Sequence, residues 1–209
     1  MSVTKTTAVV LASGGLDSTT LAYWLRSQGT AFAPVFFDYG QHCAATERER
    51  LTEVLPESIF GPLTTLNIGD IYRGCSSRLI SRADLWQESV TGDDLYLPYR
   101  NLLLLATGAA YAQSRGYSEV YAAFINSNHA REIDCSAEFF DRLGGMLSDY
   151  GRVRIRMPFR DYSKRKVAEL GILLNAPIAR TFSCQAAALV PCGACPNCRD
   201  RLSALDGLE

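Results

Sequence analysis

A run of small and hydroxyl residues, Ser13-Gly14-Gly15-Leu16-Asp17-Ser18, constrains this chain more than any other stretch. It follows the apolar residues 8–12, and a helical pattern over residues 19–25 comes directly after it. A short β-branched run that ends in two glycines and opens into a helix is typical of a strand–loop–helix unit. Glycines let backbone N–H groups approach a ligand closely, and a helix start adds unpaired N–H donors. The stretch therefore predicts a loop that binds phosphate or pyrophosphate.

The spacing of the glycines separates this loop from two other phosphate-binding loops. A third glycine at the offset of the Rossmann fingerprint is missing, and no Gly-Lys-Ser/Thr follows, as a Walker loop requires. The string resembles the pyrophosphate loop (PP-loop) of ATP pyrophosphatases, which cleave ATP to AMP and pyrophosphate. The resemblance implies that ATP is bound by Ala12, Ser13, Gly14, Gly15, Leu16, Asp17, Ser18 and Thr19. The alternative is an ordinary turn between a strand and a helix.

Length and composition favour a single α/β domain. The chain has 209 residues, of which 47% are hydrophobic, and this is enough to bury one core. The formal net charge is −1, so no global field favours nucleic acid, and we expect no nucleic-acid partner. No apolar run reaches the length of a membrane span, and residues 1–5 lead into a strand rather than a signal peptide. We therefore expect a cytoplasmic protein without a membrane partner.

Strand-like and helix-like patterns alternate along the rest of the chain. The expected strands cover residues 31–38, 63–68, 119–124 and 153–159, and the expected helices cover 45–55, 97–115, 137–149, 164–170 and 199–205. This alternation predicts a mostly parallel, doubly wound α/β sheet with helices on both faces. Residues 69–96 lack a clear period, and we expect them to form a long insertion over the site. We expect a nucleotide-binding domain over residues 1–180, with a tail over 181–209 packed on it.

The tail contains a cysteine cluster with metal-ligand spacing. Four of the seven cysteines form the pattern Cys-x7-Cys-x2-Cys-x2-Cys, namely Cys184, Cys192, Cys195 and Cys198. Four thiolates favour a closed tetrahedral zinc site of the structural type. An iron–sulfur cluster is the first alternative, and disulfides are the second. We expect the other three cysteines to be small buried or half-buried residues: Cys43, Cys75 and Cys135.

The loop and the cysteine tail together resemble the 7-cyano-7-deazaguanine synthases (QueC-like proteins), over nearly the whole chain. The other matching motifs are Tyr39-Gly40-Gln41, Pro98-x-Arg100-Asn101, Asp134-Cys135, Lys164 and Thr181-Phe182-Ser183-Cys184. The resemblance implies an adenine nucleotide alpha-hydrolase-like fold and an ATP-dependent C–N ligase. Such an enzyme adenylates the carboxylate of 7-carboxy-7-deazaguanine and transfers the acyl group to ammonia, which gives the amide and then the nitrile of the queuosine pathway.

The same resemblance implies roles for individual residues. The catalytic residues are Asp17, Ser18, Arg100 and Lys164, with Asp17 as the carboxylate that orients Mg²⁺. The substrate-binding residues are Tyr39, Gln41, His42, Asn101, Phe124 and Asp134. Phe37, Tyr39 and Phe124 are stacking candidates for a planar acid, and Asp134 is an acceptor for amidine-like N–H groups. The resemblance further implies a homodimer.

The sequence departs from the family pattern at three places. His42-Cys43 follows Gln41 where the family has a basic residue and a histidine, and residues 128–133 are rewritten. Tyr99 replaces a small residue, and we expect it to narrow the site. Three alternatives therefore stay open: a divergent paralogue that joins the acid to a protein amine in antiphage defence, a PP-loop tRNA thiolation enzyme, and a non-catalytic nucleotide-binding module.

Overall fold

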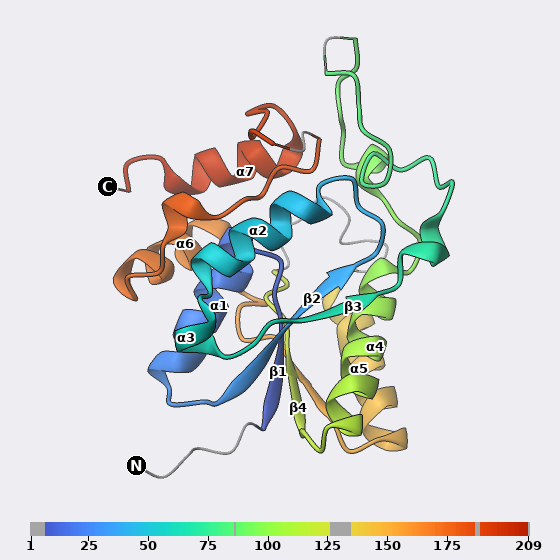
Figure 1. The fold of residues 1–209 in the computed structure, drawn as a ribbon, viewed down its shortest axis with the longest axis vertical. Coiled ribbons are helices and arrows are strands. Elements are labelled where there is room, and N and C mark those ends of the chain that lie inside the picture. The colour runs from blue at the N-terminus through green and yellow to red at the C-terminus, as the bar shows by residue number, and fades with distance from the viewer. Residues whose placement is uncertain (1–6, 86, 126–134, 187–188, 209) are drawn as a thin grey trace.

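A parallel β-sheet forms the centre of the molecule (Figure 1). The computed structural model describes residues 7–85, 87–125, 135–186 and 189–208. In these residues the strands are β1 Ala8–Leu11, β2 Phe32–Asp38, β3 Thr64–Asn67, β4 Glu119–Tyr121 and β5 Arg154–Arg156. The helices are α1 Leu16–Ser27, α2 Ala44–Val54, α3 Glu57–Phe60, α4 Arg100–Ser114, α5 Ala137–Tyr150, α6 Lys164–Leu173 and α7 Pro196–Leu205.

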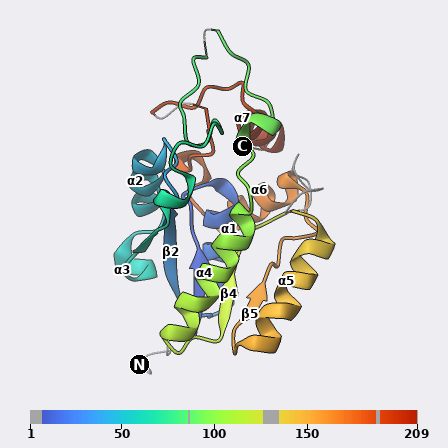
Figure 2. The same ribbon diagram turned by 90° about the vertical axis from the view of Figure 1, so that its right-hand side faces the viewer.

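Helices cover both faces of the sheet, with α1 and α6 on one face and α4 and α5 on the other (Figure 2). The two central valines of β1 show why a continuous apolar run is needed there. Val9 is fully buried in the core cluster under α4, and Val10 is fully buried in the cluster of α1 and α6. Because successive strand residues point to opposite faces, a strand covered on both sides needs apolar residues at every position.

The strand order is β3-β2-β1-β4-β5, and all four pairings are parallel. The chain runs outward from β1 through β2 to β3, and then crosses to the other side of β1 to form β4 and β5. The order therefore reverses between β1 and β4, and this is where open α/β sheets form a ligand crevice beyond the carboxyl ends of the strands. The predicted doubly wound α/β fold is confirmed.

Most differences from the predicted elements occur at their ends. The expected helix over 97–115 begins only at Arg100, because Tyr99 at its N-cap has a left-handed backbone with φ of +55°. The closing helix begins at Pro196 rather than at 199, since proline is well tolerated in the first turn, so Cys198 is helical. The short helix α3 was not predicted.

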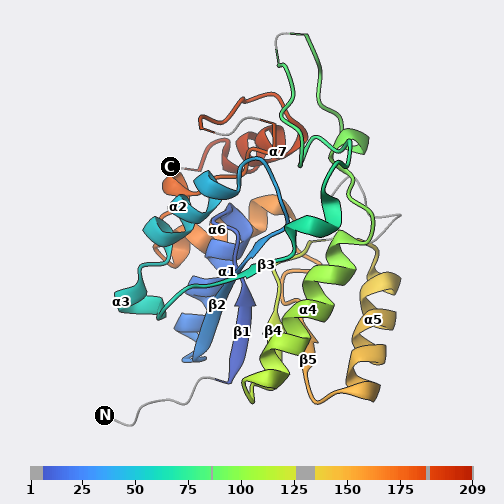
Figure 3. The same ribbon diagram turned by 45° about the vertical axis from the view of Figure 1, so that its right-hand side comes forward.

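The segment that joins β3 to α4 projects past the carboxyl ends of the strands (Figure 3). Within its described residues it contains only 3₁₀ turns at Gly69–Tyr72 and Asp93–Leu95. No helix in the described ranges has both the length and the apolar character needed to cross a bilayer.

Candidate functional site

The loop after β1 is shaped by the two serines near its ends. Ser13 N donates to Ser18 Oγ over 3.2 Å, and the two hydroxyl oxygens are also 3.2 Å apart. The Ser18 hydroxyl donates to the Gly15 carbonyl over 3.3 Å. Gly15 is the N-cap of α1 and has no side chain that could accept from the first helical N–H groups. The start of α1 therefore keeps free amide donors and the positive end of its dipole, as an anion site requires.

Gly14 is held where no side chain fits. Its φ is +74°, and a Cβ on it would lie 2.8 Å from the backbone oxygen of Glu47 and 3.0 Å from Leu51 N, both in α2. The Gly14 carbonyl accepts a hydrogen bond from Phe182 N over 2.9 Å. The loop is thus packed against α2 and tied to the C-terminal segment, which makes its shape rigid.

An ion pair joins α1 to α6 beside the loop. Lys164 Nζ, on the first residue of α6, donates to Asp17 Oδ2 in the first turn of α1. Ser163 caps α6 by accepting from Lys166 N over 3.2 Å, which fixes the start of the helix and therefore Lys164. The second carboxylate oxygen of Asp17 is buried and has no hydrogen-bond partner among the described residues. A carboxylate with one open oxygen beside an anion-binding loop is suited to a divalent cation.

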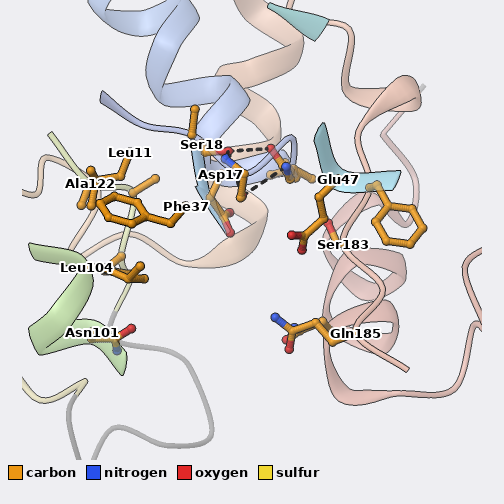
Figure 4. A pocket seen from close by; sticks show the side chains of 18 of the residues that line it. Leu11, Asp17, Ser18, Phe37, Glu47, Asn101, Leu104, Ala122, Ser183 and Gln185 are labelled. Atoms are coloured by element: carbon orange, nitrogen blue, oxygen red, sulfur yellow. Dashed lines mark hydrogen bonds between the residues drawn. The ribbon is translucent and has the colours of Figure 1, made fainter. Parts of the chain in front are cut away.

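The loop forms the floor of a cavity of ≈ 270 Å³ at the switch point between β1 and β4. One side of the cavity, which we call the apolar wall, consists of Leu11, Phe37, Leu104, Ala122 and Phe124. The opposite side, which we call the polar wall, contains Glu47, Ser183 and Gln185, and Asn197 and Asp200 of α7 also line the cavity. Figure 4 shows Leu11, Leu104 and Ala122 across the cavity from Ser183 and Gln185.

The apolar wall contains a fixed aromatic ring. Phe124 stacks on Phe140 with ring centroids 5.3 Å apart and an interplanar angle of 8°. Phe140 belongs to the buried core under α5, so it holds the Phe124 ring in one orientation. Rigid aromatic and aliphatic groups on one side of a cavity are suited to a planar ring.

The polar wall contains a buried carboxyl group. Glu47 is only 8% exposed, and its Oε2 accepts from Gln41 Nε2 over 2.9 Å. Gln41 is itself fixed, because its Oε1 accepts from Tyr39 N over 2.9 Å. Burial raises the pKa of Glu47, and hydrogen bonds from Gln41 and Cys43 together with the charge of Arg100 oppose this rise. Burial likewise raises the pKa of the Tyr39 phenol, which therefore stays neutral.

Arg100 and Asn101 enter the cavity from the start of α4. The left-handed backbone of Tyr99 directly before them turns the chain, at a cost of about 1 kcal/mol for a residue with a Cβ. The Tyr99 side chain is 67% exposed and lines an outer groove with Ile71. The expectation that Tyr99 narrows the site is therefore wrong, because the left-handed turn directs its ring away from the cavity. Asn101 is buried, and its Nδ2 donates to Cys135 Sγ over 2.9 Å.

The four cysteines of the tail converge on one point. Their sulfur atoms all lie within 4.8 Å of one another, and Cys192 Sγ is 4.0 Å from Cys198 Sγ. Sulfurs around one tetrahedral Zn²⁺ at about 2.3 Å lie about 3.8 Å apart, so the cluster fits such an ion after a small contraction. Burial raises the pKa of Cys198, and a divalent cation would offset this cost by holding the thiolates. None of the seven cysteines, all of them described, forms a disulfide in the structure, which disagrees with the disulfide alternative.

The cysteine cluster and the polar wall are interleaved in sequence. Ser183 and Gln185 flank one cluster residue, Cys184, while Asn197 precedes another, Cys198. The ring Nε2 of His42 lies 3.1 Å from the Gln185 carbonyl and joins the tail to the start of α2. A metal held by the cysteines would therefore also fix the polar wall.

The structure brings most of the predicted site residues together. The predicted residues that line the cavity are Ala12, Ser13, Gly15, Leu16, Asp17, Ser18, Tyr39, Gln41, Arg100, Asn101, Phe124 and Lys164. Three others do not line it: Gly14 faces α2, Thr19 is buried behind the loop, and His42 contacts Gln185. Asp134 and the rewritten residues 128–133 lie outside the described ranges. The cavity lining includes no described residue of 69–96, so the expected cover over the site is not seen there.

The polar wall is the part of the site that was missed. In α2 the buried side chains Glu47, Leu51 and Val54 follow a spacing of four and three residues, which is the inward stripe of a helix. The presence of a glutamate among these inward positions was the sequence signal that could have predicted a buried carboxyl group. Asp200 offered no comparable signal, because it becomes part of the site only when the tail packs across the loop.

Comparison with protein families decides the relationship of this chain. A family model described as "Queuosine biosynthesis protein QueC" matches residues 7–209. The chain belongs to the QueC family. Among its relatives, the 7-cyano-7-deazaguanine synthase of Methanospirillum hungatei JF-1 is 31% identical over 208 residues, with 94% of this chain and 93% of the relative covered. A relative of the same name from Halobacterium salinarum is 32% identical, with 96% and 91% covered. The predicted QueC family is confirmed.

Solved structures agree with the fold. A 4-thiouridine synthetase in a complex with RNA and bound ATP superposes with a TM-score of 0.58 at 16% identity, covering 91% of this chain and 45% of that one. At this identity the likeness concerns the fold alone. The QueC-family chain thus has the α/β fold of PP-loop enzymes, with a C-terminal cysteine cluster that has the geometry of a zinc site.

Proposed function

We propose that this QueC-family protein is an ATP-dependent ligase that adenylates the carboxylate of 7-carboxy-7-deazaguanine and transfers the acyl group to ammonia. One observation carries the proposal: the PP-loop, with its Asp17–Lys164 ion pair, forms the floor of a cavity whose apolar wall suits a planar ring. The names of the relatives, which are 7-cyano-7-deazaguanine synthases, support the same product.

The floor of the cavity performs the activation. A carboxylate conjugated to an electron-rich ring is a poor electrophile, so its oxygen must first become part of a better leaving group. Attack of that oxygen on the α-phosphorus of ATP forms the acyl-adenylate and expels pyrophosphate. The backbone N–H groups at the start of α1 and the hydroxyls of Ser13 and Ser18 bind the pyrophosphate, while Lys164 and Arg100 offset its charge.

Mg²⁺ would supply further charge neutralisation at the phosphates, and the open oxygen of Asp17 is the group that would hold it. Asp17 is also anchored by Lys164, so its position does not depend on the metal. The residues of the cysteine cluster would hold Zn²⁺ in a purely structural role, since four thiolates leave no coordination position for a substrate.

The acid binds between the two walls. The Phe124 ring and Leu104 contact the face of the planar base, and Asn101 lies at the same side of the cavity. Ammonia then attacks the acyl carbon and releases AMP, which gives the amide. Adenylation of the amide oxygen by a second ATP, followed by elimination, gives the nitrile 7-cyano-7-deazaguanine.

The experiment that tests the function is a substrate-dependent assay of AMP release. The purified protein is incubated with ATP, Mg²⁺ and ammonium, with and without 7-carboxy-7-deazaguanine, and the product is identified by mass spectrometry. We expect AMP and pyrophosphate only when the acid is present, and a product with the mass of the amide or nitrile. No acid-dependent AMP would refute the proposal, and a product attached to a protein would show that an amine replaces ammonia.

A further inference from the structure

One buried carboxyl group in the cavity has no role in the activation step. Glu47 lies on the inward face of α2, and its side chain lines the polar wall. Its position is fixed from two sides. The Oε2 atom accepts from Gln41 Nε2, and the Glu47 backbone packs directly against Gly14 of the loop. The group is therefore held beside the loop where the acyl-adenylate would form.

The charge of Glu47 limits what it can bind. A carboxylate at this depth repels both the phosphates of ATP and the carboxylate of the acid, so it gives no advantage in the activation step. It attracts a cation or a strong N–H donor instead. Magnesium would be held elsewhere, by the open oxygen of Asp17 beside the anion-binding loop. The reactant that arrives as a cation is the nitrogen nucleophile, because ammonia is mostly ammonium at neutral pH.

We propose that Glu47 is a catalytic residue that binds the incoming ammonium ion and removes a proton from it. This inference rests on the proposed function, and it adds the site at which the nucleophile is bound and activated. Glu47 lies across the cavity from the apolar wall, so a nucleophile bound by it faces the acyl group of an acid that is packed on that wall.

Ammonium transfers one proton to the Glu47 carboxylate and becomes ammonia, whose lone pair forms the new C–N bond at the acyl carbon. The bond between that carbon and the AMP oxygen breaks, and its electron pair stays on the phosphate. The second proton leaves the amide nitrogen for water. No oxidant or reductant takes part.

The surroundings of Glu47 suit a proton acceptor. Burial raises its pKa, which makes the carboxylate a stronger base than an exposed glutamate. The groups that act on it are Gln41 and Cys43 before α2, Arg100 of α4 and Asp38 at the end of β2. Arg100 lowers the pKa of Glu47, and Asp38 raises it further, so the carboxyl group stays able to accept and release a proton.

The test separates activation from nitrogen transfer by using Glu47→Gln, which keeps the shape and removes the base. We expect acid-dependent ATP–pyrophosphate exchange within about twofold of the wild type, and amide formation from ammonium at neutral pH reduced by roughly 10²-fold or more. Hydroxylamine is uncharged at neutral pH and needs no prior deprotonation, so hydroxamate formation should be near the wild-type rate. The matched control is Glu49→Gln, which alters an exposed glutamate on the same helix and should change neither reaction.

Three results would overturn the inference: loss of exchange together with amide formation, undiminished amide formation, or an equal loss with hydroxylamine and ammonium. If wild-type exchange itself does not depend on the acid, it is the proposed function that fails.

The pKa of Glu47 is higher in the folded protein than in an exposed glutamate. The folded state therefore loses stability as the pH rises above the pKa of an exposed glutamate, because Glu47 must then be ionised while buried. Glu47→Gln should therefore melt at a higher temperature than the wild type at pH 7, and this gain should shrink towards acid pH.

If Glu47→Gln does not fold, Glu47→Asp gives a second test. It keeps a carboxylate but withdraws it by one methylene group from the cavity. We expect normal exchange, slower amide formation from ammonium, and unchanged hydroxamate formation. Equal slowing of all three reactions would contradict the assigned role.

Discussion

The two walls of the cavity are built from parts of the chain that are stabilised in different ways. The apolar wall comes from β1, β2, α4 and the residues after β4, and it continues directly into the sheet core. The polar wall comes from α2 and from the C-terminal tail. In the tail, the wall residues Ser183 and Gln185 are sequence neighbours of the cluster residue Cys184. Hydrophobic burial thus fixes the wall that would contact the ring. A few hydrogen bonds fix the polar wall, and a metal held by the cysteine cluster would fix it further.

The core therefore fixes one part of the site, and local contacts fix the other. The apolar wall depends on residues that the core needs in any case, whereas the floor is held by packing against α2 and by the hydrogen bond from Phe182 N to the Gly14 carbonyl. The polar wall depends on local contacts, such as the one between His42 Nε2 and the Gln185 carbonyl, and on the cysteine cluster. Three substitutions, one each in the cysteine cluster, the floor and the apolar wall, test whether these parts contribute separately.

The largest effect is expected for Cys195→Ser, which removes one of the four sulfur ligands. We expect zinc content to fall well below one ion per chain and the free energy of unfolding to fall by on the order of 5 kcal/mol, because metal binding contributes directly to folding. Elemental analysis and thermal melting measure these two quantities. Cys75→Ser is the control, since Cys75 is half-buried and lies outside the cluster. Full metal content and an unchanged melting temperature would show that Cys195 is not a ligand.

The next effect is expected at the floor, for Asp17→Asn. Loss of the charge leaves Lys164 unpaired and removes the carboxylate that would hold Mg²⁺, so adenylation should fall by about 10²- to 10³-fold. The rate of acid-dependent ATP–pyrophosphate exchange measures this step, and circular dichroism checks that the fold is kept. Asp149→Asn, on the exposed side of α5, should leave exchange unchanged. Undiminished turnover in Asp17→Asn would refute the role of Asp17.

The smallest effect is expected at the apolar wall, for Leu104→Ala. Removal of part of the contact with the ring should raise the KM for the acid about fivefold, or ~1 kcal/mol, with a smaller change in kcat. Steady-state kinetics with varied acid measures both constants. Leu103→Ala alters the neighbouring residue of α4, which faces the outer groove, and should leave KM unchanged. An equal rise in KM for both variants would indicate a general loss of α4 packing.

The sequence was sufficient for the parts of the molecule whose signals are local. The strand–loop–helix unit around Ser13, the metal-ligand spacing of the cysteines and the bounds of α5 could all be predicted, because each depends on periodicity, turn residues or spacing within a short window. The alternation of elements was enough for the parallel sheet. The role of Asp134 as an acceptor stays a prediction, since it lies outside the described residues.

The rest of the site depends on tertiary contacts that a local pattern does not contain. Glu47 looks like one more charge on a charged helix, and only packing against the loop turns it into a buried cavity group. Asp200 becomes part of the site only when the tail packs across the loop. Tyr99 was misjudged because a single left-handed residue reversed the side on which its ring lies. Backbone dihedral angles of this kind are set by the whole fold.

The hydrogen bond from Phe182 N to the Gly14 carbonyl has a consequence for the order in which the protein is made. During synthesis the loop at Gly14 leaves the ribosome long before residue 182 is translated. The nascent sheet can therefore pair β1 with β2 early, while the loop gains its hydrogen bond from Phe182 only after the tail emerges. A ribosome-bound chain that stops before residue 182 should contain the first strands and still lack a finished loop, so we expect the loop to bind its ligand only in chains that are almost complete.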